Sequence, residues 1–139
     1  MAFIEALIFG WLGAITLFLT TVSPTVFASL DQEQSSRFLR AYFPRLFSTE
    51  AIVGFVIIVL SIYISATGGL FINGFSIGLL VIFFALINLK LITPQLNDAT
   101  DKWIEDKCKR TKRRFIVLHA LSVGLFGLNA LAMILLIIL

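Results

Sequence analysis

The sequence is poor in the residues that build disulfides, metal centres and charged active sites. It contains one cysteine, Cys108, and one histidine, His119, among 139 residues, and only 14% of its residues are charged. A disulfide within one chain is therefore impossible, and clusters that need several thiolate ligands are excluded. Catalytic motifs such as GxSxG, HExxH, the P-loop and GxGxxG are also missing. We therefore expect a non-enzymatic protein with no bound metal or cofactor.

Apolar residues, in contrast, are abundant. They make up 59% of the chain, and the mean hydropathy is +1.01. A soluble domain is roughly 45–50% apolar and about 25% charged, and a chain this small cannot bury such an excess. Intrinsic disorder needs low hydrophobicity and is excluded as well. The first residues include Glu5 and no lysine or arginine, so we do not expect a cleaved signal peptide. The composition predicts an integral membrane protein.

Four apolar runs are each close to the ~20 residues that cross ~30 Å of hydrocarbon as a helix. None of them alternates in polarity, as barrel strands do. We therefore predict an all-α membrane protein, a single domain over residues 1–139 that forms a four-transmembrane-helix bundle. The predicted helices cover residues 3–22, 51–71, 75–92 and 115–139.

The basic residues lie almost entirely in two connections between these helices. Three of the eleven are in residues 23–49 and seven are in residues 93–114, while Lys90 lies at the end of the third helix on the same side. The positive-inside rule predicts that both connections are cytoplasmic. Both termini and the uncharged turn around residues 68–74 would then lie outside the cytoplasm. The location that we expect is the bacterial inner membrane.

The first connection has the pattern of a short helix at the lipid surface. Ser29 and Gln32 have capping-box spacing, and the residues that follow give the segment an apolar side. Pro44 is expected to end this helix before the second membrane span begins.

The second connection predicts a helix from about Asp98 that runs straight into the fourth membrane span. Three acid-to-base pairs with i,i+4 spacing support it, and these are Asp98–Lys102, Glu105–Lys109 and Asp106–Arg110. A basic cluster follows, made of Lys107, Lys109, Arg110, Lys112, Arg113 and Arg114. The cluster is interpreted as a topology anchor or as a contact for anionic lipid. Nucleic acid is not expected as a partner, because no basic face with aromatic residues stands clear of the membrane.

Polar residues inside the predicted spans suggest a possible intramembrane pocket. His119, Ser122 and Asn129 share one stripe of the fourth helix, Asn88 lies deep in the third, and Glu50 lies at the inner entrance of the second. One interpretation is that these groups hold the helices together through hydrogen bonds. The other is that His119, Asn88 and Glu50 line a pocket for a proton, an ion or a small ligand.

Two weaker patterns concern helix packing. The two halves are similar at an offset of 70 residues, where Val22-Ser23-Pro24 corresponds to Ile92-Thr93-Pro94. This predicts two parallel hairpins related by an axis along the membrane normal, or is a chance similarity of apolar helices. Four glycines are expected to permit close helix contacts, namely Gly10, Gly13, Gly124 and Gly127.

Several of these marks together resemble a known family. They are Pro24 and Phe27, Phe43-Pro44, Asn88, Pro94, and an F-x3-H-x2-S-x6-N run over Phe115, His119, Ser122 and Asn129. The chain resembles a four-helix membrane domain of unknown function that is shared by many bacterial proteins and by the eukaryotic transmembrane protein 205 group. It departs from the pattern after Pro44, where Arg45-Leu46-Phe47 contains no tyrosine. The resemblance implies a four-helix membrane protein and brings no established reaction.

Three functions are weighed on these grounds. The first is a non-enzymatic membrane module that self-associates, as a homo-oligomer, or serves as an accessory subunit of a larger membrane complex. The second is binding or transport of a small solute or metal ion through the polar pocket on helices two to four. The third, a redox protein with a haem-like cofactor on His119, is least favoured because one histidine supplies at most one axial ligand.

Overall fold

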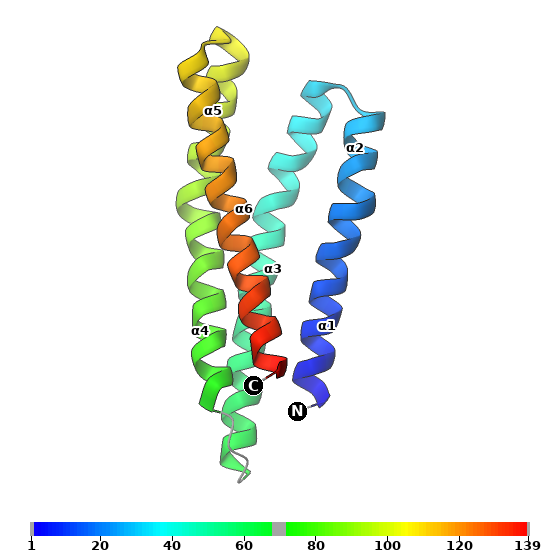
Figure 1. Cartoon of the computed structure of the whole chain (residues 1–139), viewed down its shortest axis with the longest axis vertical. Coiled ribbons are helices and arrows are strands. Elements are labelled where there is room, and N and C mark those ends of the chain that lie inside the picture. The colour runs from blue at the N-terminus through cyan, green and yellow to red at the C-terminus, as the bar shows by residue number, and fades with distance from the viewer. Residues whose placement is uncertain (1, 68–71, 139) are drawn as a thin grey trace.

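The chain folds into four long helical rods, each antiparallel to the one before it in the chain (Figure 1). The computed structural model describes residues 2–67 and 72–138. Each rod is long and apolar enough to span a membrane, which confirms a multi-pass, all-α membrane protein. The rods consist of α1 (Ala2–Leu17), η1 (Phe18–Val22) and α2 (Ser23–Ser29); α3 (Gln32–Ala66); α4 (Ile72–Ile87), η2 (Asn88–Ile92) and α5 (Thr93–Asp106); and α6 (Lys109–Ile138).

The connection predicted over residues 23–49 is almost entirely helical. Only Leu30 and Asp31 separate α2 from α3. The capping box is real but lies two residues later than predicted, because the Asp31 carboxylate accepts from the backbone N of Gln34 at 2.8 Å. The Gln34 side chain in turn accepts from the backbone N of Asp31 at 3.3 Å.

The separate surface helix predicted before Pro44 is wrong, since α3 continues through this proline as one rod of 35 residues. A proline costs a helix interior about 3 kcal/mol, so packing must hold α3 together here. The Tyr42 ring stacks on Phe18 of the first rod, with centroids 4.4 Å apart, and Phe43 stacks on Phe47 at 6.0 Å. This aromatic packing on both sides of Pro44 stabilises the helix that the local sequence would break.

The other two prolines also fail to end their helices, because the backbone widens before each one. A proline ring clashes with the carbonyl four residues earlier. In the π-helical turns η1 and η2, the backbone N–H of Ser23 bonds to the carbonyl of Phe18, and that of Thr93 bonds to the carbonyl of Asn88. This five-residue spacing makes room for Pro24 and Pro94 one position further on.

The predicted continuous helix from Asp98 into the fourth span is also wrong. The chain breaks at Lys107, which has a φ of 48°, and α6 begins only at Lys109. Asp106 stabilises the break, since its Oδ1 accepts from the backbone N of Cys108 at 2.9 Å and from the Thr111 hydroxyl at 2.8 Å. Of the three predicted i,i+4 pairs, Asp98–Lys102 is the one that forms among the described residues, at 2.9 Å.

The 70-residue repeat is present in the first part of each half and is lost after it, because α2 ends at Ser29 whereas α5 continues to Asp106. α1 and η1 correspond to α4 and η2 residue for residue at this offset. The buried positions repeat as well. In the first rod they are Ile4, Ile8, Trp11, Ile15 and Phe18, and in the third they are Gly74, Gly78, Val81, Ala85 and Asn88. The first rod and the third rod therefore place the same helix face toward the interior.

The closest helix contact lies between α3 and α4, at Gly54 and Gly78. A Cβ on Gly78 would lie 2.8 Å from the Gly54 carbonyl oxygen, so only glycine fits there. The four glycines predicted to permit close contacts do not do so among the described residues. A Cβ on any of them would meet no atom within 4 Å. The apolar core lies nearby, around Ile8, Ile57 and Met133.

Candidate functional site

Two buried asparagines join α6 to the third rod through reciprocal hydrogen bonds. Asn88 Nδ2 donates to the Ser122 carbonyl, and Asn129 Nδ2 donates to the Val81 carbonyl, each at 3.3 Å. Both bonds run from a side chain on one helix to the backbone of the other, and seven residues separate the two positions on each helix. Neither asparagine is exposed at all. The predicted role of these amides in joining helices therefore has a geometric basis.

Glu50 lies next to Asn129 inside the bundle and not at a helix entrance as predicted, because α3 begins already at Gln32. Its side chain is fully buried, and neither carboxyl oxygen has a hydrogen-bond partner among the described residues. The side-chain oxygens of Asn88 and Asn129 are also buried without a partner in this part of the chain. Asn129 lies nine residues before the end of α6, about 14 Å along the axis, which is near the middle of ~30 Å of hydrocarbon.

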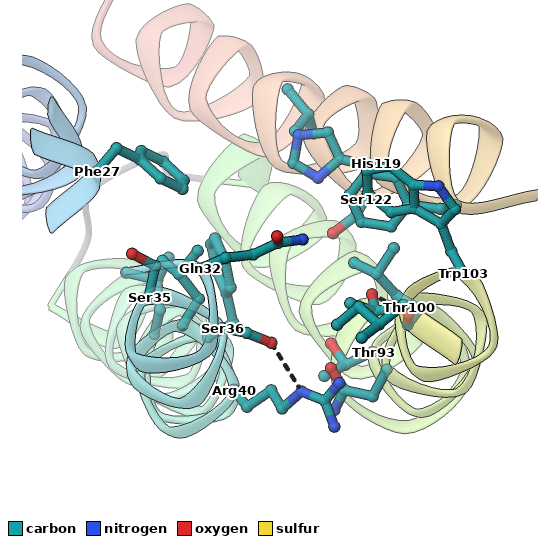
Figure 2. A pocket seen from close by; sticks show the side chains of 18 of the residues that line it. Phe27, Gln32, Ser35, Ser36, Arg40, Thr93, Thr100, Trp103, His119 and Ser122 are labelled. Atoms are coloured by element: carbon teal, nitrogen blue, oxygen red, sulfur yellow. Dashed lines mark hydrogen bonds between the residues drawn. The ribbon is translucent and has the colours of Figure 1, made fainter. Parts of the chain in front are cut away.

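A cavity of about 550 Å³ lies between α3, α5 and α6, toward the end of the bundle that carries the α2–α3 and α5–α6 connections. Figure 2 shows Phe27 at one edge and His119, Ser122 and Trp103 on the opposite wall. The lining is mostly apolar, and Arg40 is its one charged residue among those described. The volume is typical of a pocket for a small molecule.

Three stacked rings form the α5–α6 wall of this cavity. Trp103 stacks on Phe115 with centroids 5.3 Å apart, and Phe115 stacks on His119 at 5.8 Å. The Lys112 ammonium lies 5.9 Å from the centre of the Trp103 ring. His119 is therefore held by aromatic stacking at the cavity surface, and its side chain is exposed.

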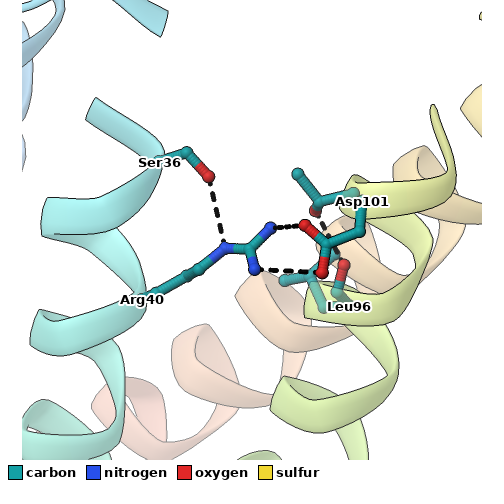
Figure 3. Close-up of polar contacts among 5 residues, drawn as sticks. Ser36, Arg40, Leu96 and Asp101 are labelled. Atoms are coloured by element: carbon teal, nitrogen blue, oxygen red, sulfur yellow. Dashed lines mark hydrogen bonds and ion pairs between the residues drawn. The ribbon is translucent and has the colours of Figure 1, made fainter. Parts of the chain in front are cut away.

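An ion pair ties α3 to α5 beside the cavity (Figure 3). The Arg40 guanidinium donates from both terminal nitrogens to the Asp101 carboxylate, and its Nε donates to the Ser36 hydroxyl at 3.3 Å. This bidentate contact links segments 61 residues apart. It could not be predicted from the sequence, because no local pattern joins the two residues.

The predicted polar pocket is thus divided into three parts. Asn88 meets Ser122, Glu50 meets Asn129, and His119 faces the cavity one helical turn from Ser122. The aromatic rings of Phe47 and Phe126 pack edge to face in the cavity lining, and sequence reasoning missed them because both resemble ordinary apolar core residues.

The predicted basic cluster lies around the start of α6, and its side chains are exposed. Arg114 pairs with Asp98 at 3.4 Å, and Lys112 lies over Trp103. Lys107, Lys109, Arg110 and Arg113 make no ion pair with the residues that the structure describes.

Comparison with known proteins gives one match. No curated protein and no solved structure matches the chain. A family model described as "Domain of unknown function (DUF4149)" matches residues 6–105, which cover the first three rods. The match supports membership of a family of unknown function, and it does not bear on the transmembrane protein 205 group. The chain therefore belongs to the family of domains of unknown function DUF4149.

Proposed function

We propose that this membrane protein binds a small amphipathic molecule from the surrounding lipid in the cavity between α3, α5 and α6. The observation that carries the proposal is the mostly apolar cavity of about 550 Å³, with His119 and Ser122 on one wall and Arg40 on the other. Among the described lining residues there is no acidic side chain. A ligand with an apolar body and one anionic or hydrogen-bond-accepting group would match this lining. The proposal narrows the predicted binding of a small solute to one chemical class.

A fluorescence experiment with a brominated fatty acid tests this proposal. Trp103 lies in the cavity wall, whereas Trp11 on α1 lies in the apolar core of the bundle. A Trp11→Phe variant therefore leaves one tryptophan, and it lies beside the cavity. Dibromostearate bound in the cavity is expected to quench Trp103 with saturation. Val123→Phe should weaken this quenching several-fold, because Val123 lines the cavity.

Val117→Phe is the matched control. Val117 lies on the same helix with a similar exposure, 58% against 55% for Val123, but does not line the cavity. Quenching that rises without saturation, or that is equal in the Val123 and Val117 variants, indicates partition into lipid and refutes the proposal.

We also propose self-association, or association with another membrane subunit, as a second candidate. The outward positions of Gly10 and Gly13 on α1, and of Gly124 and Gly127 on α6, support it. Small residues let helices approach closely inside a membrane, and these four approach nothing within the described chain. Gly127→Leu should then reduce the mass of the complex isolated in mild detergent. A wild-type chain that always runs as a monomer, without a partner, would refute this candidate.

We infer the orientation from the positions of the basic residues. The end of α3 at Ala66, the start of α4 at Ile72 and the two termini lie at one end of the bundle, and the basic α5–α6 junction lies at the other (Figure 1). The positive-inside rule supports a cytoplasmic position for that junction in a bacterial inner membrane. Cys108 is exposed and is the natural reporter. A membrane-impermeant maleimide should label Cys108 from the cytoplasmic face only, whereas Thr67→Cys in a Cys108→Ser background should be labelled from the opposite face. Labelling of both from one face would refute this threading.

We propose, finally, that the kinship extends to the transmembrane protein 205 group. The F-x3-H-x2-S-x6-N run on α6 supports it, and this run lies outside the residues that the family model matches. Sequences intermediate between the two groups should keep all four positions of the run.

A further inference from the structure

Glu50 is a carboxylic acid that lies deep in the bundle without a partner. Its side chain has no exposed surface, and both carboxyl oxygens lack a hydrogen-bond donor among the described residues. Ionisable groups inside a membrane are costly and are commonly functional. A carboxyl group that served only to join helices would be expected to hold at least one donor.

Among the described residues, no ion pair joins Glu50 to a positively charged group. α4 contains no charged or titratable side chain, and α1 contributes only Glu5, in its first turn. Lys90 of η2 is exposed. His119 on α6 is ten residues from Asn129, which is about 15 Å along the helix. Arg45 on α3 itself donates to a backbone carbonyl of its own helix. The Asn129 amide is the polar neighbour that the structure gives to Glu50.

The donor set suits a proton better than a metal ion. Among the described residues no three His, Cys, Asp or Glu side chains lie close enough together to hold a metal. Zinc takes about four ligands and calcium six to eight, whereas a proton needs a single oxygen lone pair. Adding one proton to the Glu50 carboxylate gives a neutral acid and supplies the site with the donor that it lacks.

Glu50 lies on α3 close in sequence to residues that line the cavity. Leu46 and Phe47 line the cavity floor from α3, and Phe126 lines it from α6. Glu50 lies one helical turn beyond Leu46 and Phe47. The rings of Phe47 and Phe126 meet edge to face, with centroids 6.0 Å apart, and both line the cavity.

We propose that Glu50 is an intramembrane proton-binding site that is reached from the cavity past Phe47 and Phe126. The proton comes from water at the cavity end of the bundle, adds to the carboxylate without any change in electron count, and leaves by the same route. Asn129 acts as a positioning residue for the carboxyl group. The inference does not depend on a ligand in the cavity, so the two proposals can fail separately.

Dicyclohexylcarbodiimide is a suitable probe, because it adds to protonated carboxyl groups in apolar surroundings. We expect one adduct per chain on the Glu50 peptide by mass spectrometry, with a yield that falls as the pH of the buffer rises. Glu50→Gln should lose the adduct, and Glu5→Gln should keep it, because Glu5 lies on another helix outside the proposed site. Phe126→Ala should raise the rate of labelling several-fold, whereas Phe83→Ala, on an outward face of α4, should not change it.

Three results would overturn the proposal. They are an adduct on Glu50 whose yield does not depend on pH, an equal yield in wild type and Glu50→Gln, and the absence of any adduct on Glu50. Equal rates in Phe126→Ala and wild type would overturn the route. If Glu50→Gln does not fold, infrared spectra of the wild type at several pH values still decide the question, since a carboxyl band must shift in wild type and must change in Asn129→Leu.

Discussion

Among glycine-to-alanine replacements at the glycines whose surroundings are described, the one at Gly78 should loosen the contact between α3 and α4 most. The new Cβ would lie 2.5 Å from Cγ1 of Ile58, 2.8 Å from the carbonyl oxygen of Gly54 and 3.3 Å from the backbone N of Ile58. The Ile58 side chain can rotate away, but the backbone atoms move only if the two helices separate. Overpacking of this kind costs about 1–3 kcal/mol. Alanine regains up to about 1 kcal/mol through its higher helix propensity. We therefore expect a net loss of about 1–2 kcal/mol.

The assay is equilibrium unfolding of the purified protein in mild detergent, compared with a matched glycine-to-alanine variant. Gly127→Ala is the control, because a Cβ there meets no atom within 4 Å. It should leave the unfolding free energy unchanged or raise it by up to about 1 kcal/mol. Gly54→Ala should fall between the two, since its nearest contacts are all at 3.0 Å. Equal stabilities of the Gly78 and Gly127 variants would show that α3 and α4 do not pack as described.

Three further predictions follow from other contacts. Asn88→Leu and Asn129→Leu should each lose about 0.6–1.7 kcal/mol of unfolding free energy in the same assay, while Asn73→Leu, at the exposed start of α4, should not. If neither Asn88→Leu nor Asn129→Leu loses stability, the reciprocal hydrogen bonds are contradicted. A double-mutant cycle of Arg40→Gln and Asp101→Asn should give a coupling free energy below about 1 kcal/mol that shrinks with added salt, because the two side chains are 33% and 53% exposed. A larger coupling free energy that does not depend on salt would mean that the pair is buried. The double variant Arg110→Gln, Arg113→Gln should retain less anionic lipid, as measured by native mass spectrometry, at about 1 kcal/mol of binding free energy for each charge. Arg114→Gln should lose less lipid because Arg114 already pairs with Asp98, and equal retention in all variants would limit the basic cluster to a topology anchor.

Membrane insertion could be predicted from the sequence because it depends on sums over many residues. Mean hydropathy and the lengths of the apolar runs are insensitive to the placement of any one side chain. The four spans and the all-α fold follow from them. The helix ends failed for the opposite reason, because each depends on one or two local contacts. Asp31 caps α3 and Asp106 ends α5, and each outcome is decided by two local hydrogen bonds.

The prolines show how tertiary packing overrides local preference. Pro44 lies within α3 because aromatic rings pack on both sides of it. Pro24 and Pro94 follow widened turns that no composition rule predicts. The glycines failed similarly, since the sequence shows where close approach is allowed but not which pair of helices uses it. Gly54 and Gly78 form the contact, and the four predicted glycines face outward.

The candidate site was predictable in its residues and not in its arrangement. Polar side chains in an apolar run are conspicuous, so His119, Ser122, Asn129, Asn88 and Glu50 could all be selected. Their division among two asparagine contacts, a buried acid and a cavity wall depends on which faces of α3, α4 and α6 meet. Helix periodicity alone leaves those faces open, because all four rods are apolar on most sides.

The correspondence between the two halves has a consequence for stoichiometry. Equivalent positions carry Phe18 in one half and Asn88 in the other, and Trp11 in one and Val81 in the other. The backbone of α1 and η1 is repeated in α4 and η2, but the hydrogen-bonding chemistry is not. A ligand or proton bound in the interior therefore has one site in each molecule. A titration that counted two equal sites per polypeptide would have to be explained by a second copy of the chain.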